Sequence, residues 1–136
     1  MIVGLLSLYL SVNTFASEDM QAISKTIFAF AKAGDENNAD ELANYLDENY
    51  RIVLNQLFGS ETVSIMDRQT YLDKIRSKEF GGDKREVIIE SITLNGNTAY
   101  VKVIMKGKMM TTISLIGLVK NKDGIWKLIS DIPVIF

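Results

Sequence analysis

Acid–base chemistry in this chain can fall only to carboxylates, tyrosines and lysines. The sequence contains no His and no Cys. This excludes Ser-His-Asp and Cys-His nucleophilic sites, thiol redox chemistry, and zinc sites with nitrogen or sulfur ligands. A general acid or base would therefore be an Asp, Glu, Tyr or Lys. Without Cys there are also no disulfides, which suits both the cytosol and a bacterial periplasm.

Asp131 is the best candidate for such a role. It has the same strand parity as Lys127 and Ile129, near a chain end that is otherwise apolar. A carboxylate pointing into an apolar cavity has a raised pKa and can act as a general base. The other interpretation, which we favour, pairs Asp131 with Lys127 or a neighbouring strand on the solvent face. Glu90 presents the same choice, and we interpret it as a charged residue of an edge strand. No catalytic residue is therefore assigned, and Asp131 stays a candidate.

Several side chains could line a pocket suited to a small planar ligand. The predicted lining residues are Phe30, Tyr50, Asn55, Tyr71, Met105, Trp126 and Asp131. Thr112 and Ser114, together with Asn55, could supply hydrogen bonds or could lie on the outer face. The aromatic residues could equally fill the core. For Trp126 we favour the core, because Leu128 and Ile132 have the same strand parity.

An acidic segment, Asp35–Glu41, has a superficial likeness to a calcium-binding loop. It departs from the EF-hand pattern, since Asp40 replaces the required Gly and Leu46 replaces the terminal Glu. We therefore predict a loop that connects two helices, and no metal site.

Composition places the chain among ordinary globular proteins. Its 136 residues suffice for one domain, with 47% hydrophobic and 24% charged residues and a formal net charge of −2. No block of basic residues stands out, so we expect neither nucleic acid nor an anionic membrane surface as a partner.

The first 16 residues carry no charged side chain and contain an apolar run, Ile2–Val12. This run has the length of a signal-peptide core and is too short to span a bilayer as a helix. Thr14 and Ala16 are small residues at the −3 and −1 positions of a cleavage site. We predict a signal peptide over residues 1–16 and a periplasmic or secreted domain over residues 17–136, without a stable membrane anchor. The alternative is a cytoplasmic protein whose N-terminal helix packs on the domain.

Helices are predicted in the first half of the chain and strands in the second. Apolar residues at three- and four-residue spacing predict helices over residues 18–33, starting at Ser17, and 38–47. Two short apolar runs follow at 50–58 and 62–66, and Asp67 is a predicted N-cap for a helix to about residue 78. Alternating patterns then predict strands at 85–94, 98–107, 110–120 and 125–134. In the second of these strands Ala99, Val101, Val103 and Met105 should face the helices, and the domain is α+β.

The order and spacing of several motifs resemble the nuclear transport factor 2-like superfamily. They are Gly34-Asp35 at the end of the first helix, DRQTYLDKI (Asp67–Ile75), SITLNGNTAYVKV (Ser91–Val103) and LVKNKDGIWKLIS (Leu118–Ser130). Within the superfamily, the chain is most similar to the branch named "putative lumazine-binding", near the SnoaL-like proteins. Where that branch carries an aromatic-x-Asp motif, this chain has Thr112-Ile113-Ser114. Any role of the Asp in that motif is therefore not expected in this chain.

The resemblance implies a cone-shaped α+β domain, of the type also called cystatin-like, in which N-terminal helices pack on a curved, mainly antiparallel sheet. It allows three functions. We favour a domain that binds a small apolar or planar molecule in the cone without catalysis and without a cofactor. The alternatives are a cofactor-independent lyase or isomerase that uses a pocket carboxylate, as ketosteroid-isomerase-like relatives do, and a structural dimerisation module. A homodimer would form through the exposed sheet face around Tyr100 and Ile104.

Overall fold

The computed structural model describes the backbone of residues 2–136 and the side chains of residues 15–136. Three helices form within this part of the chain: α1 (Ile2–Asp35), α2 (Ala39–Ala43) and α3 (Arg68–Arg76). Six strands accompany them: β1 (Leu46–Asn55), β2 (Val63–Asp67), β3 (Glu86–Asn95), β4 (Thr98–Lys106), β5 (Thr111–Lys120) and β6 (Trp126–Ile135). The predicted α+β class is confirmed.

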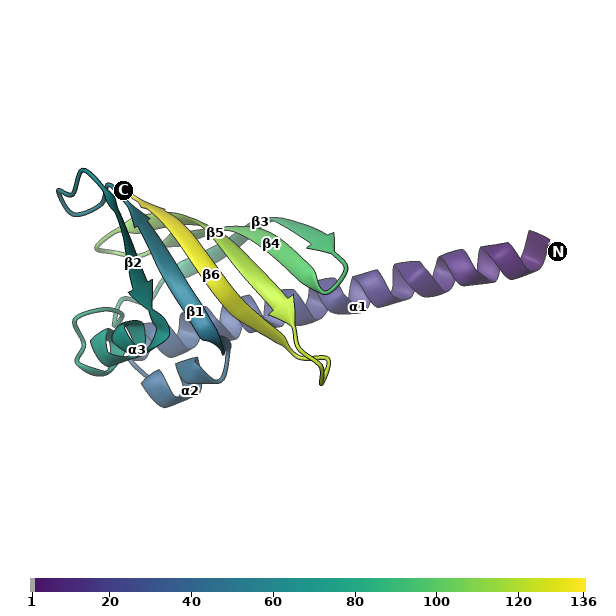
Figure 1. Ribbon diagram of the computed structural model, residues 1–136, viewed down its shortest axis with the longest axis horizontal. Coiled ribbons are helices and arrows are strands. Elements are labelled where there is room, and N and C mark those ends of the chain that lie inside the picture. Colours follow the sequence, from purple (N-terminus) through teal and green to yellow (C-terminus); the bar gives the residue numbers. More distant parts are fainter. Residues whose placement is uncertain (1) are drawn as a thin grey trace.

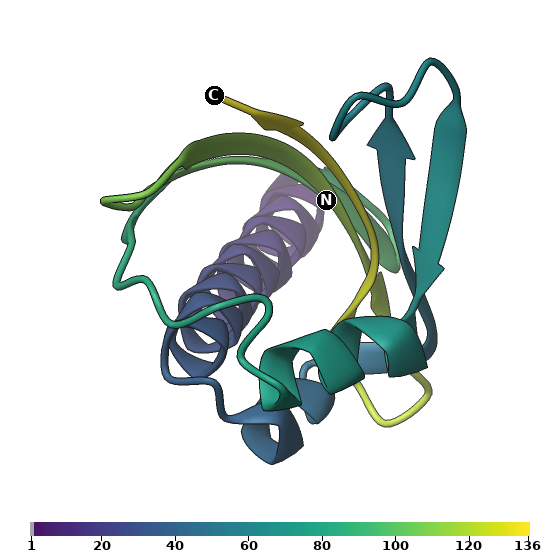
Figure 2. The same ribbon diagram turned by 90° about the vertical axis from the view of Figure 1, so that its left-hand side faces the viewer.

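All six strands belong to one curved sheet with the order β2-β1-β6-β5-β4-β3. Every neighbouring pair is antiparallel except β1 and β6, which run parallel. The sheet curls over the C-terminal half of α1, and α2 and α3 lie together below its edge (Figures 1 and 2). This arrangement is the predicted cone of helices packed against a mainly antiparallel sheet.

Helix α1 packs one apolar face into the curve of the sheet. Ile23, Ile27 and Phe30 are buried there, as their helical spacing predicts. The predicted start at Ser17 is wrong, because α1 continues back to Ile2. No Gly or Pro stands between residues 5 and 33 to interrupt the helix.

The predicted signal peptide falls on the first half of α1. Met1 and the side chains of residues 2–14 lie outside the described part of the chain, so the leader stays a prediction. In the described residues, no helix combines the length and the apolar character needed to cross a membrane.

The second helix is shorter than predicted. It begins after Asn38, whose side chain accepts a hydrogen bond from the Glu41 backbone N–H, and it ends at Ala43 rather than at residue 47. The carbonyl of Tyr45 accepts a hydrogen bond from the Leu128 backbone N–H, and Leu46 then enters β1 opposite Leu128. Pairing with a distant strand therefore overrides the local helical pattern.

Helix α3 and the strands β3 to β6 follow their predicted positions closely, whereas β1 begins and ends earlier than the apolar run predicted at residues 50–58. Asp67 caps α3 by accepting a 2.8 Å hydrogen bond from the Thr70 backbone N–H. The strands β3 to β6 begin and end within about one residue of the predicted bounds. Along β4, the side chains of Ala99, Val101, Val103 and Met105 are all buried, as the alternation predicts.

Candidate functional site

A bulge in β6 places Asp131 on the inner face of the sheet. Gly117 of β5 pairs with Ser130, but the next residue, Leu118, pairs with Leu128, so Ile129 has no partner in the ladder. Such an extra residue reverses which side the following side chains face. The inner face is therefore occupied by Leu128 before the bulge and by Asp131 after it.

The predicted solvent-facing position of Asp131 is wrong for this reason. Its side chain is only 9% exposed. Lys127, its predicted ion-pair partner, donates a hydrogen bond to the backbone carbonyl of Asn44 instead. Ile132 was expected to share the inner face with Trp126, and it is exposed.

The carboxylate of Asp131 is incompletely paired. Among the described residues, no hydrogen-bond donor reaches its Oδ1 atom, which is buried. Burial raises the pKa of Asp131 to about 6, and the Ser114 hydroxyl and the positive charge of Arg85 oppose part of that rise. Its neighbours on the flanking strands are Ile116 and Ile52, both buried and apolar. The result is a carboxylate in a poorly solvated environment.

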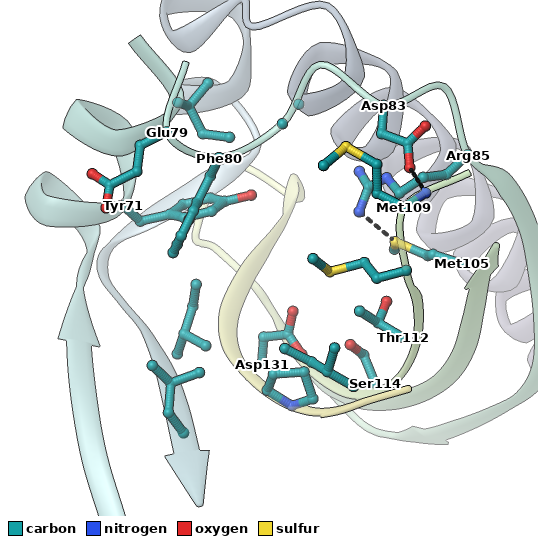
Figure 3. Close-up of a pocket in the computed structure, with 18 of the residues that line it drawn as sticks. Tyr71, Glu79, Phe80, Asp83, Arg85, Met105, Met109, Thr112, Ser114 and Asp131 are labelled. Atoms are coloured by element: carbon teal, nitrogen blue, oxygen red, sulfur yellow. Dashed lines mark hydrogen bonds between the residues drawn. The ribbon is translucent and has the colours of Figure 1, made fainter. Parts of the chain in front are cut away.

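Asp131 lines a cavity of about 230 Å³ between the sheet, α1, α3 and the segment that follows α3. Figure 3 shows its carboxylate pointing toward the middle of this cavity, with Ser114 and Thr112 beside it. The walls are mainly apolar. They include Phe30, Ile52, Leu54, Phe58, Ile75, Phe80, Met105, Met109, Met110, Pro133 and Ile135. A mostly apolar cavity with a few converging polar groups is the usual form of a small-molecule site.

Two tyrosines lie close to Asp131, and only one of them lines the cavity. The ring of Tyr71 on α3 forms part of the wall, with its centroid 6.5 Å from that of Phe80. Behind it lies Tyr50 on β1, 5.7 Å away between ring centroids and fully buried. Burial and, to a lesser degree, the charge of Asp131 raise the pKa of Tyr50 well above its usual value. Burial also raises the pKa of Tyr71, so both hydroxyls stay protonated.

Arg85 contributes the single positive charge among the described lining residues, and an ion pair already satisfies it. Its Nε donates to Asp35 Oδ1 at 2.6 Å, and its backbone N–H donates to Asp35 Oδ2 at 3.0 Å. The two Nη atoms donate to the Ala31 carbonyl and to the Met105 sulfur. The guanidinium therefore holds α1 to the start of β3 and is not free to receive an anionic ligand.

The mouth of the cavity combines exposed apolar side chains with carboxylates. Phe58 and Met109 are 71% and 82% exposed while still lining the cavity. Asp83 accepts a hydrogen bond from the Met109 backbone N–H at 3.0 Å, and the backbone N–H groups of Met109 and Lys108 lower its pKa. Glu79 pairs with Lys74 at 2.9 Å.

The predicted pocket residues divide into two groups. Phe30, Tyr71, Met105 and Asp131 line the cavity, as do Thr112 and Ser114. Three others lie elsewhere: Tyr50 is buried behind Tyr71, Trp126 is buried in the core, and Asn55 is exposed on β1.

Other candidate residues have structural positions. Trp126 Nε1 donates to Asp19 Oδ1 at 3.1 Å and so joins β6 to α1. Glu90 lies on the edge strand β3, as expected, and pairs with Lys102 at 3.1 Å. In the acidic segment, Asp35 binds Arg85, and the described residues contain no group of three or more carboxylates placed to hold a metal ion.

Sequence reasoning missed Arg85 and the residues at the mouth. Asp35 and Arg85 are 50 positions apart, and no local pattern connects them. Met109 and Met110 stand in the turn between β4 and β5, where residue type alone gives no sign that they reach the cavity.

Comparison with known protein families identifies the fold family. The family model described as "Putative lumazine-binding" matches residues 18–132. The chain belongs to this family. The match covers the cavity-lining residues from Phe30 to Asp131 and ends before Pro133 and Ile135, which also line the cavity.

Solved structures with the nuclear transport factor 2-like fold resemble this family member. A protein of unknown function from Shewanella baltica OS155 has a TM-score of 0.77 at 15% identity, over 88% of this chain and 95% of that one. A second, from Silicibacter pomeroyi DSS-3, has a TM-score of 0.78 at 15% identity, over 89% and 98% of the two chains.

A third structure, titled "Putative Scytalone Dehydratase", comes from Novosphingobium aromaticivorans DSM 12444. Its TM-score is 0.69 at 19% identity, over 91% of this chain and 88% of that one. At these identities the likeness concerns the fold alone. Among curated proteins, none matches the chain significantly.

Proposed function

We propose that this protein binds a small, largely apolar or planar molecule in its cone-shaped cavity without transforming it, and that Asp131 is the polar anchor. The observation that carries the proposal is the carboxylate of Asp131, whose buried Oδ1 has no hydrogen-bond partner, in a mainly apolar cavity. A buried polar atom without a partner is costly, and a ligand that supplies a hydrogen bond would recover that cost.

The walls suit a flat ligand. Tyr71 and Phe80 present aromatic rings tilted by 52° to one another, and Phe30 lies in the same cavity. Aromatic side chains contribute large contact areas to the binding of planar molecules. The family description names lumazine, a planar bicyclic heterocycle with ring N–H groups that could donate to a carboxylate.

The test is a binding measurement on two matched variants of β5. Thr112 lines the cavity, whereas the adjacent Thr111 points to the other side of the strand. Lumazine binding is measured by titration calorimetry. Thr112→Phe should fill the cavity and abolish this binding. Thr111→Phe should leave binding unchanged. Lumazine binding that survives in Thr112→Phe would place the ligand elsewhere, and no binding to the unmodified protein would exclude lumazine.

A second candidate function is a cofactor-independent lyase or isomerase. It is favoured by the raised pKa of Asp131, about 6, beside the protonated hydroxyl of Tyr71. Asp131 could accept a proton from substrate while Tyr71 donates a hydrogen bond to the oxyanion that develops. One fold neighbour bears the name of a dehydratase, which is a lyase. A pH–rate profile on a panel of ketones and hydroxy acids tests it, and an equal rate in Asp131→Asn would exclude this function.

We also propose that the protein is exported after removal of residues 1–16. The cleavage pattern Thr14-Phe15-Ala16 supports this proposal. Amino-terminal sequencing of protein purified from its own cells should begin at Ser17. A chain that still begins with Met1 would favour the cytoplasmic alternative.

A further inference from the structure

The charges around the cavity are strongly unequal. Among the described lining residues, the carboxylates are Asp131, Glu79 and Asp83, and the single cationic group is Arg85. Arg85 is neutralised by Asp35, and Glu79 by Lys74. The remaining negative charge of the cavity is therefore that of Asp131 inside and Asp83 at the mouth.

These two carboxylates differ in what stabilises them. Asp83 accepts a backbone hydrogen bond from Met109, and its side chain faces water at the mouth. Asp131 is 9% exposed, has a buried Oδ1 without a partner, and receives no ion pair within the described residues. An ionised carboxylate in an apolar site is costly until a positive charge or strong donor approaches it.

The aromatic walls also favour a positively charged ligand. Tyr71 and Phe80 border the cavity that contains Asp131 (Figure 3), and Phe30 lines it from α1. One face of the Phe80 ring already has Lys74 Nζ over it, 5.3 Å from the ring centroid. The faces of aromatic rings carry partial negative charge and attract cations within about 6 Å. An anionic ligand would meet these faces and two carboxylates, and the Arg85 guanidinium is already engaged by Asp35, Ala31 and Met105.

We propose that the ligand of this cavity is an organic cation, an aromatic or apolar amine whose protonated nitrogen pairs with the Asp131 carboxylate. This inference rests on the proposed binding function and narrows it to one ligand class. The ring or alkyl body occupies the space bordered by Phe30, Tyr71 and Phe80, and the ammonium group points toward β6. A neutral molecule of the same shape fills the same space but leaves the carboxylate without its counter-charge.

The experiment compares three probes with one ring system and different charges: 2-naphthylmethylamine, 2-naphthylmethanol and 2-naphthoate. Titration calorimetry at pH 7 on the full chain should give the tightest binding for the amine. We expect about a tenfold advantage over the alcohol, the equivalent of one charge-assisted hydrogen bond, and the weakest binding for the carboxylate.

Two variants test whether Asp131 causes the tighter binding of the amine. Asp131→Asn should reduce the advantage of the amine over the alcohol to within about twofold, since the ring contacts remain. Glu90→Gln is the matched control, because it removes a carboxylate that pairs with Lys102 on the outer edge strand, away from the cavity. It should leave the advantage unchanged.

The outcomes separate this inference from the proposed function. Equal or tighter binding of the alcohol or the carboxylate by the unmodified protein would overturn the cation inference and leave small-molecule binding standing. Retention of the full amine advantage in Asp131→Asn would also overturn it, by assigning the cation to another group. Failure of all three probes to bind would count against both proposals.

Discussion

Gly117 and Ser130 face each other across β5 and β6, and a side-chain carbon on Gly117 would lie 2.6 Å from the Ser130 hydroxyl oxygen. This pair is the last regular one before the bulge at Ile129. The register of the ladder changes at this pair, where the Ser130 hydroxyl occupies the space that a side chain at position 117 would need. Because of that change, Asp131 faces the cavity and not solvent.

Gly117→Ala should destabilise the protein by about 1 kcal/mol, because the added carbon overlaps the Ser130 hydroxyl. The added carbon would also lie 3.5 Å from Ile129 Cγ2 and 3.8 Å from Ser130 Cβ, which are normal van der Waals distances. In a Ser130→Ala background the same change should be neutral or stabilising, since Ala is preferred to Gly within a strand. Urea unfolding of the four proteins checks this. An equal loss in both backgrounds would show that the hydroxyl is not the obstacle.

Asp131→Asn should stabilise the protein at neutral pH. The folded-state pKa of Asp131, about 6, lies above the ordinary value of 3.8, so the folded protein disfavours the ionised form. The ionised Asp131 therefore lowers the free energy of unfolding. This loss grows as pH rises from about 4 to about 6, stays constant above that range, and amounts to about 3 kcal/mol at most. Urea unfolding from pH 4 to pH 8 should show the two proteins diverging over that window. A variant less stable than the unmodified protein at pH 7 would contradict the raised pKa.

Amine binding should weaken in acid. Asp131 must be ionised to pair with a cation, so affinity for 2-naphthylmethylamine should fall by up to about tenfold per pH unit below pH 6. The other groups around Asp131 are the hydroxyls of Tyr50, Tyr71 and Ser114 and the guanidinium of Arg85. None of these changes charge between pH 5 and pH 8, because both tyrosine pKa values are raised. A flat calorimetric profile over this range would remove Asp131 from the contact.

The sequence predicts the elements whose structure depends on residues close together in the chain. Strands β3 to β6 follow from alternating apolar residues and from Gly at the turns, and α3 follows from the Asp67 cap. The length of α2 and the side on which Asp131 lies could not be predicted in this way. Leu46 leaves the helical pattern because Leu128, far along the chain, pairs with it. The bulge at Ile129 depends on how two strands meet, which no residue type in β6 records.

The candidate site was therefore predicted in part. Phe30, Tyr71 and Met105 could be anticipated as inward-facing residues from their periodicity, and they line the cavity. The Asp35–Arg85 pair joins residues 50 positions apart, so only the folded chain reveals that the guanidinium is already satisfied. Among the described lining residues, no free positive charge is therefore left for an anionic ligand, and this supports the inferred organic cation.

Asp19 should contribute to stability by joining α1 to the β5–β6 hairpin. Its Oδ1 accepts hydrogen bonds from Lys120 Nζ at 2.9 Å and Trp126 Nε1 at 3.1 Å. Asp19→Ala should cost about 1–2 kcal/mol, because the buried indole N–H loses its partner. Asp19→Asn keeps an acceptor and should cost less. Urea unfolding followed by tryptophan fluorescence measures both, and equal losses would mean that the indole hydrogen bond contributes little.

The contact of Asp19 with Lys120 also predicts that the stability of the protein depends on pH under acidic conditions. The hydrogen bond from Lys120 is the main cause that lowers the pKa of Asp19, and burial opposes it. The stabilisation is therefore complete above the ordinary pKa of 3.8 and is lost as pH falls through the lower folded-state value. Between pH 5 and pH 3, Asp19→Ala should lose less stability than the unmodified protein. An identical loss in the two proteins would contradict the lowered pKa.

The outer face of the sheet should mediate a homodimer. Strand register aligns Ile104, Ile113 and Val134 in one row, and Leu115 with Ile132 in the next. Leu115, Ile132 and Val134 are 45%, 39% and 51% exposed. Contiguous exposed apolar rows on a sheet face are typical of protein interfaces.

Leu115→Glu should convert the predicted dimer into a monomer in sedimentation equilibrium, because a second copy would bury two added carboxylates. Lys102, opposite position 115 on β4, is already paired with Glu90. Asn55→Lys is the matched control, since Asn55 is exposed on β1 away from these rows, and it should leave the mass unchanged. Ligand affinity should survive in the Leu115→Glu monomer, because every cavity residue described above comes from one chain. A monomeric unmodified protein would exclude this interface at the concentrations measured.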